Sequence, residues 1–228
     1  MPRFASYLSE GMQKLGHSVE VLRPKPYLSK LPLKGSGKKW IGYVDQYVIF
    51  SLFLFFKTRF TSKKNLYVLS DQALGLWAPI ISSKAHVVHC HDFLAFKSAK
   101  GEISANPVGA TGKLYQKMIY NGFSKAENFI SVSKNTMLEL EELLPKKPQI
   151  SSYVYNGLNS LFEVGSQITA RENLTKFLNA SMANGYFLHV GGNHFYKNRI
   201  GLIKIYNYWR DISTLKIPLV LIGSAPDE

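Results

Sequence analysis

Short apolar runs and amphipathic helical segments alternate along most of this 228-residue chain, and this alternation constrains its fold more than any other feature. Helices that alternate with strands carry the backbone across a sheet, so that successive strands run parallel. Strands are predicted at 18–22, 66–69, 86–89, 128–132, 149–155, 186–190 and 217–222. Helices are predicted at 4–15, 40–60, 74–77, 114–123, 134–144, 171–178 and 198–210. The sequence therefore predicts an α/β fold with a parallel sheet and helices on both of its faces.

Cysteine content and the chain's start both suit a reducing compartment. Cys90 is the single cysteine, which excludes an internal disulfide. Met1-Pro2-Arg3 leads straight into a helical pattern, so we expect no secretory leader. We therefore expect a cytoplasmic protein, with contact at the inner face of a membrane as an open alternative.

Positive charge is concentrated in the first part of the chain. The net charge is +13; residues 1–64 hold twelve Lys and Arg against three Asp and Glu, a net of +9. Residues 65–228 hold sixteen Lys and Arg against twelve Asp and Glu, a net charge of +4. A basic segment of this kind favours an anionic partner such as nucleic acid, an acidic membrane or a phosphorylated substrate. A solvated surface is the alternative.

One apolar run, at 40–60, raises the question of a membrane. Its uncharged part, residues 46–56, is eleven residues long, well short of the about 20 needed to span a bilayer. The run predicts either a buried helix or a helix that lies in a membrane interface. In the second case its basic flanks would meet anionic lipid: Lys38, Lys39, Lys57, Arg59, Lys63 and Lys64.

Polar residues follow two of the predicted strands. His91 and Asp92 follow the strand at 86–89, and Asp71 follows the strand at 66–69. Ligands of open parallel sheets bind at the carboxyl ends of strands, so His91 and Asp92 are candidates to contact a substrate hydroxyl. A structural role for His91 is an equal alternative. Asp71 either caps the next helix or holds an acceptor hydroxyl.

Strand parity argues against two other kinds of site here. His89 and His91 lie on one face of an extended strand and His86 lies on the other, so no three-histidine metal site is expected. Cys90 points away from His91, which disfavours a nucleophilic Cys–His pair.

The segment 186–199 reads as a strand, a glycine-containing loop and a helix. Gly191 and Gly192 end the strand, and Lys197 stands at the start of the helix. Glycine lets the backbone approach an anion, the helix start offers N–H groups, and lysine adds a positive charge. The segment therefore predicts a phosphate site, with an exposed lysine beside a tight turn as the alternative.

Four segments in order resemble glycosyltransferase family 4, the retaining enzymes of the GT-B fold, over nearly the whole chain. These segments are His89–Asp92, Ser131–Asn135, Asn156–Asn159 and Gly191–Asn198. The resemblance implies a Rossmann-like acceptor-side domain at 1–157, a linker at 158–184 and the start of a second Rossmann-like, donor-binding domain at 185–228.

The resemblance also implies a function, which is transfer of a sugar from a nucleotide-sugar to an acceptor with retention. His91 would lie near the transferred sugar, and Gly191, Lys197 and Asn198 would hold the donor phosphates. Asp71 and Asp92 would contact a glycan or lipid-linked acceptor. It implies no cofactor, no metal and no nucleic-acid partner, with peripheral membrane contact as an open alternative.

The chain departs from the family pattern in two places. Gly192 stands where the family usually has arginine, so Arg199 or His194 would have to complete the phosphate clamp. No glutamate has another glutamate eight positions later, although the family has such a pair. We expect the first strand before Met1 and the glutamate pair beyond Glu228, and therefore no turnover from this chain alone. Two alternatives remain: a non-catalytic remnant that binds acceptor or an anionic membrane, and an unrelated nucleotide-binding α/β protein.

Overall fold

The computed structural model describes residues 2–30, 36–61, 64–157 and 163–225. The chain divides into two compact units, Met1–Asn156 and Gly157–Glu228. Each unit contains its own parallel sheet.

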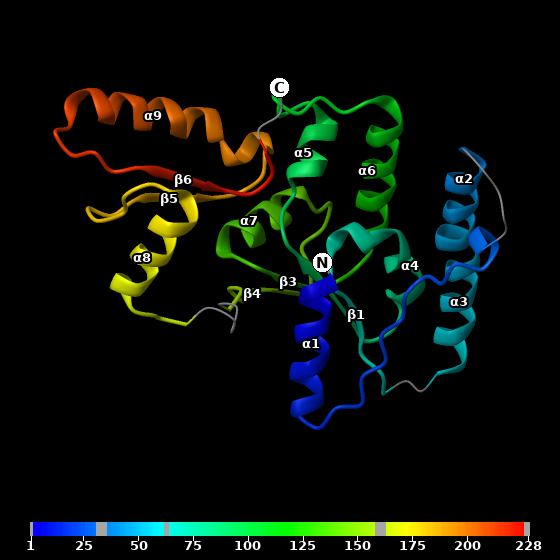
Figure 1. Ribbon diagram of the computed structural model, residues 1–228. Helices are drawn as coiled ribbons and strands as arrows, with labels where there is room; N and C mark the ends of the chain where they lie inside the picture. Colours follow the sequence, from blue (N-terminus) through cyan, green and yellow to red (C-terminus); the bar gives the residue numbers. More distant parts are fainter. Residues whose placement is uncertain (1, 31–35, 62–63, 158–162, 226–228) are drawn as a thin grey trace. The chain divides into compact units, whose positions relative to one another are not determined.

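The first unit is built on a four-stranded parallel sheet with strands in sequence order (Figure 1). The strands are β1 (Tyr67–Leu69), β2 (His86–Cys90), β3 (Asn128–Ser131) and β4 (Ile150–Tyr153). Helical segments connect each pair of consecutive strands, because parallel strands need a crossover connection. They are η3 (Gln72–Trp77), α4 (Ala78–Ile81), α5 (Leu94–Lys100), α6 (Ala110–Phe123) and α7 (Lys134–Leu143). The predicted α/β class with a parallel sheet is confirmed, and this sheet is consistent with a Rossmann-like fold.

The core of the first unit lies where β2 and β3 meet the helices. Val88, Cys90 and Phe129 are completely buried, and Phe123 of α6 packs against the same cluster. Helix α6 approaches η3 closely because both carry glycine at the crossing. A Cβ on Gly122 would lie 2.1 Å from the carbonyl oxygen of Gly75, so neither position has room for a side chain.

The predicted strand at 18–22 is wrong. Residues 17–27 follow α1 (Pro2–Lys14) without regular secondary structure, and the sheet begins at β1. Leu22 packs instead against the side-chain cluster of Phe50, Leu54 and Trp77. The segment is held by apolar contacts of its side chains and not by a backbone ladder, which is why its apolar pattern misleads.

The predicted helix at 40–60 is confirmed as one continuous helical stretch. It comprises α2 (Ser36–Val44), the π-helical turn η2 (Asp45–Ile49) and α3 (Phe50–Phe60). Phe50 and Leu54 face the unit's interior. Asp45 accepts hydrogen bonds from the backbone N–H groups of residues 27–29, which overlap the short helical turn η1 (Leu28–Lys30). Within the described residues, no helix is both long and apolar enough to cross a membrane.

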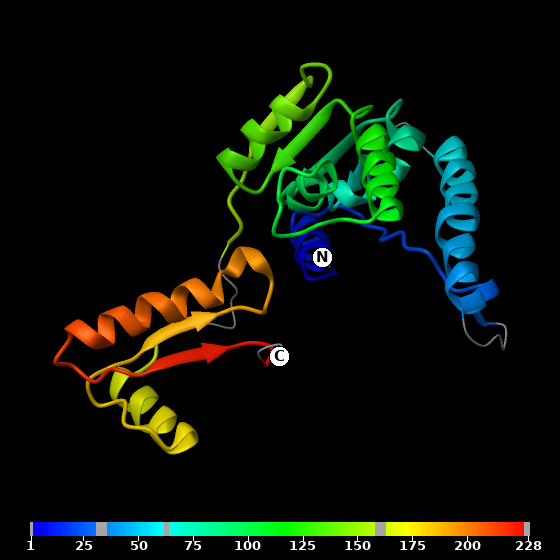
Figure 2. The same cartoon turned by 90° about the horizontal axis from the view of Figure 1, so that it is seen from above.

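The second unit contains the parallel pair β5 (Phe187–Val190) and β6 (Leu219–Ile222). Figures 1 and 2 both show α8 (Gln167–Leu178) and α9 (Arg199–Ile212) on opposite sides of this pair. A short helical turn, η4 (Phe195–Lys197), leads into α9. Helix α8 begins four residues before the predicted start at 171, because the Ser166 hydroxyl accepts a hydrogen bond from the Thr169 N–H and caps it there.

Candidate functional site

Polar side chains gather at the carboxyl ends of β1 and β2 in the first unit. Ser70 and Asp71 follow β1, and His91 and Asp92 follow β2, which pairs with β1 in parallel. The two strand ends therefore meet at one edge of the sheet. This edge is where open parallel sheets bind ligands.

His91 is held in a defined orientation by its neighbours on β1. Its Nε2 lies 2.9 Å from the carbonyl oxygen of Ser70, and its backbone N–H donates to the Gln72 side chain over 2.8 Å. A carbonyl oxygen only accepts, so Nε2 carries the hydrogen. This leaves Nδ1 as the nitrogen that can accept a hydrogen bond or a proton. The side-chain amide of Gln72 also donates to the carbonyl oxygen of Asp92, which ties the two strand ends together.

Phe4 of α1 packs against two histidines at this edge. Its ring lies edge-on to His91 at 4.7 Å and to His89 at 5.0 Å between ring centroids. Burial, and secondarily the nearby His91, lower the pKa of His89 to about 4. His89 is therefore neutral at pH 7, and its ring and that of Phe4 form an apolar wall beside His91.

The third histidine of β2 has a structural role. The Nε2 of His86 accepts a hydrogen bond from the Glu127 backbone N–H, and its Nδ1 faces the carbonyl oxygen of Lys84 at 2.8 Å. Both ring nitrogens are therefore occupied. No group of three or more metal-ligating side chains occurs within the described part of the chain.

The two candidate carboxylates both cap the segments that follow them. Asp71 is buried, and its side chain accepts a hydrogen bond from the Ala73 N–H at the start of η3 over 2.8 Å. Asp92 is exposed and accepts one from the Leu94 N–H at the start of α5 over 3.1 Å. Asp71 thus has the capping role predicted as one of its two alternatives, whereas Asp92 keeps an exposed carboxylate beside His91.

In the second unit, the predicted phosphate segment forms a tight loop between β5 and α9. The Gly191 N–H continues the ladder to the Ile222 carbonyl oxygen of β6 over 2.8 Å. A Cβ on Gly191 would lie 3.2 Å from the Cγ and Cδ atoms of Lys197, so the lysine chain passes directly over this glycine. Asn198 adopts φ 45° and caps α9 by accepting from the Gly201 N–H.

Arg199 organises this loop from inside. It is 9% exposed, and its guanidinium donates to the carbonyl oxygens of Gly191 and Ser224 and to the side-chain oxygen of Asn193. These acceptors are all neutral. Its Nε is buried without a hydrogen-bond partner, and across the described residues no carboxylate pairs with Arg199. The loop therefore encloses a positive charge that the described residues do not neutralise.

Lys197 adds a second positive charge at the same loop. Its Nζ lies 5.6 Å from the centroid of the Tyr196 ring, and it makes no ion pair with any described residue. His194 stacks on Tyr196 with ring centroids 5.5 Å apart. Of the two residues that could replace the family's arginine, Arg199 thus lies buried beneath the loop and His194 lies against a ring on its outside.

Sequence reasoning missed four residues that order these two strand ends. Phe4 and Gln72 position His91, and Asn193 and Ser224 hold Arg199. For Ser224 the sequence held a partial signal of a tight turn, because the predicted strand at 217–222 is followed by Gly223 and then by Ser224. Gly223 has φ 147°, and a Cβ there would lie 1.9 Å from the Gly191 carbonyl oxygen. The other three act through contacts distant in sequence or through a loop geometry without a motif.

Comparison with known proteins adds no family to these observations. No protein-family model matches the chain, and a search of the curated proteins found no match either. The resemblance to glycosyltransferase family 4 therefore stays a prediction from the motifs and their order.

Proposed function

We propose that this chain takes part in sugar transfer from a nucleotide-sugar to a glycan or lipid-linked acceptor in the cytoplasm, with retention at the anomeric carbon. The donor diphosphate would bind at the loop between β5 and α9. His91 would contact the sugar or the acceptor through Nδ1, with Asp92 beside it. The proposal rests on the order of the sequence motifs and on the chemistry of the two strand-end sites.

One observation carries the donor part of this proposal, namely the uncompensated positive charge of the β5–α9 loop. Arg199 is buried with neutral acceptors, and Lys197 lies over Gly191 without an ion pair to any described residue. A buried cation is costly without a counter-charge, so an anion at this loop is favoured. A leaving diphosphate gains negative charge as the glycosidic bond breaks, and fixed positive groups stabilise that charge.

The acceptor part rests on His91. An imidazole whose Nε2 donates to the Ser70 carbonyl oxygen presents Nδ1 as the acceptor for a hydroxyl group. The wall formed by Phe4 and neutral His89 limits water on one side of the ring. This arrangement suits the positioning of a polar, uncharged ligand such as a sugar.

Direct binding of nucleotides to the purified chain tests the proposal. The panel is UDP-, GDP- and ADP-sugars, with NAD⁺ as a nucleotide that carries no transferable hexose, measured by calorimetry at fixed salt. We expect one class of nucleotide-sugar to bind and NAD⁺ to fail. Lys197→Ala should weaken that binding about 10-fold or more, because a charge-assisted contact to phosphate is lost.

Lys204→Ala is the matched control, because Lys204 is an exposed lysine of α9 that carries the same charge. It should leave the affinity within about twofold. Equal losses in the two variants would show only a general electrostatic effect. Absence of binding to every nucleotide-sugar, or preferred binding of NAD⁺, would contradict the proposal.

A further inference from the structure

Helix α3 presents a large apolar surface to solvent. We define the α3 outer face as Leu52, Phe53, Phe55, Phe56 and Phe60, whose side chains are 47–84% exposed. Taking about 200 Å² for each phenylalanine, these residues expose on the order of 500 Å². This area matches that of the largest apolar patch on a typical monomer, and here it is concentrated on one helix. Patches of this size are often interaction sites.

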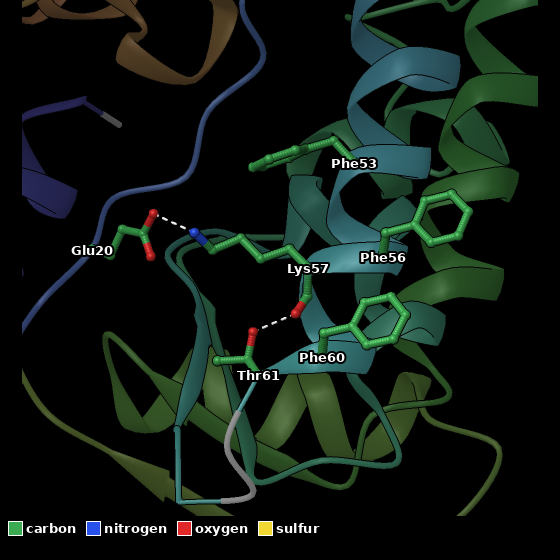
Figure 3. Close-up of a pocket in the computed structure, with 6 residues that line it drawn as sticks. All are labelled: Glu20, Phe53, Phe56, Lys57, Phe60 and Thr61. Atoms are coloured by element: carbon green, nitrogen blue, oxygen red, sulfur yellow. Dashed lines mark hydrogen bonds and ion pairs between the residues drawn. The ribbon is translucent and has the colours of Figure 1, made fainter.

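Two rings of this face lie side by side on one flank of α3. Figure 3 shows Phe56 and Phe60 projecting to the same side of α3, as residues four apart do on a helix. In Figures 1 and 2, α2 and α3 lie at the margin of the first unit in both views. The opposite side of α3 is anchored, because Phe50 and Leu54 pack with Trp77.

The charged side chains beside the α3 outer face include the cations Arg59 and Lys57 and the carboxylate of Glu20. Asp45 is the single acidic residue between Ser36 and Phe60, and it is buried with its carboxylate bound to the backbone of residues 27–29. Arg59 is exposed. Lys57 extends to the other side of α3, where it pairs with Glu20 (Figure 3). Glu20 is exposed and lines the same groove, so it neutralises Lys57, and the charge that complements a negatively charged surface is that of Arg59 and of the net +9 carried by residues 1–64.

These residues also shape an open groove of about 560 Å³. Phe53, Phe56 and Phe60 supply apolar walls, and the Lys57 ammonium lies at the rim, 5.8 Å from the centroid of the Phe53 ring. Because Glu20, which also lines the groove, pairs with this ammonium, the apolar walls are the feature that matches the boundary of the acyl chains.

We propose that the α3 outer face docks on the surface of an anionic phospholipid bilayer. The phenylalanine rings enter the boundary of the acyl chains, and Arg59 meets the headgroups. Because no described helix can cross a membrane, the contact is peripheral. A second copy of this chain is a poorer occupant, because the net charge of +13 opposes self-association. This inference is independent of the proposed sugar transfer.

Vesicle co-sedimentation of the full chain tests this docking. The probes are vesicles of phosphatidylcholine alone and vesicles of phosphatidylcholine mixed with phosphatidylglycerol. We expect binding to the mixed vesicles, weakened by added salt, and little binding to the neutral ones. The double variant Phe56→Ser/Phe60→Ser should lower the partition coefficient about 10-fold or more, because two apolar anchors are lost.

Two further variants separate the apolar contribution of α3 from its charge and from general hydrophobicity. Ile205→Ser/Ile212→Ser removes equally exposed apolar residues from α9 and should leave vesicle binding unchanged. Arg59→Glu leaves the apolar face intact and should weaken binding to anionic vesicles alone. Equal binding to neutral and anionic vesicles, or undiminished binding by both α3 variants, would overturn the proposal. So would a concentration-dependent dimer that Phe56→Ser/Phe60→Ser abolishes.

Discussion

At the scale of single residues, His89 links the stability of the first unit to pH. Its pKa is about 4 in the folded chain against an ordinary 6.5, because the ring is buried and His91 lies nearby. Between these two pKa values, His89 is protonated in the unfolded chain and neutral in the folded chain. The stability that neutral His89 contributes is therefore complete above pH 6.5 and is lost as the pH falls toward 4.

We therefore expect the urea midpoint of unfolding to fall between pH 7 and pH 5, and to fall less in the variant His89→Gln. The slope with pH is the readout, because the substitution by itself can alter the absolute midpoint. His17→Gln changes an exposed histidine and should keep the original slope. If His89→Gln retained the full pH dependence, other groups would be responsible for it.

At the scale of elements, the β5–α9 loop depends on one buried side chain. Arg199 begins α9, yet its guanidinium donates to the loop after β5 and to the loop after β6. The two strand ends are therefore joined by a side chain in addition to their backbone ladder. A planar guanidinium can serve three acceptors at once, whereas a lysine ammonium lacks this fork.

Arg199→Met should destabilise the second unit by about 2 kcal/mol, because carbonyl groups that accepted from a charged donor lose that donor. Hydrogen exchange of the amides of Gly191 and Ile222 measures the effect. Arg210→Met is the control, because Arg210 lies on the exposed side of α9 over the Tyr206 ring. In this variant the free energy of exchange of the same two amides should change by less than about 0.5 kcal/mol. Equal protection in both variants would refute the organising role of Arg199.

At the scale of the whole molecule, the two units differ in how much they bury. The first unit has a four-stranded sheet and a contiguous buried cluster centred on Phe129. The described part of the second unit has a two-stranded sheet, and among its residues only Met182, Arg199 and Val220 are buried. Two strands bury too little apolar surface for high stability.

We therefore expect amides of β5 and β6 to exchange through openings of lower free energy than those of β2 and β3. Native-state hydrogen exchange across a urea series measures both. Phe129→Ala should remove about 3–5 kcal/mol of protection from β2 and β3, because it opens a cavity in the core. Stronger protection of β5 than of β2 in the unsubstituted chain would contradict this ranking.

Much of the fold could be predicted because it depends on local patterns. Apolar runs and caps, such as Ser133 before α7, placed most strands and helices near their observed positions. The segment 18–22 failed because an apolar run does not reveal whether a neighbouring strand is there to pair with it. Helix α5 was missed because it is short and its sequence carries no clear periodicity.

By itself, the sequence determined the α/β class, the parallel sheet, the strand end before His91 and the loop that contains Lys197, because local periodicity and turn chemistry specify these. Tertiary structure alone decided the partners of those residues: Phe4 and Ser70 for His91, and Arg199 beneath the loop that Lys197 crosses. It also decided that one side of α3 is buried and the other exposed. Such outcomes depend on which distant segments meet, and a linear pattern of residue types does not contain that information.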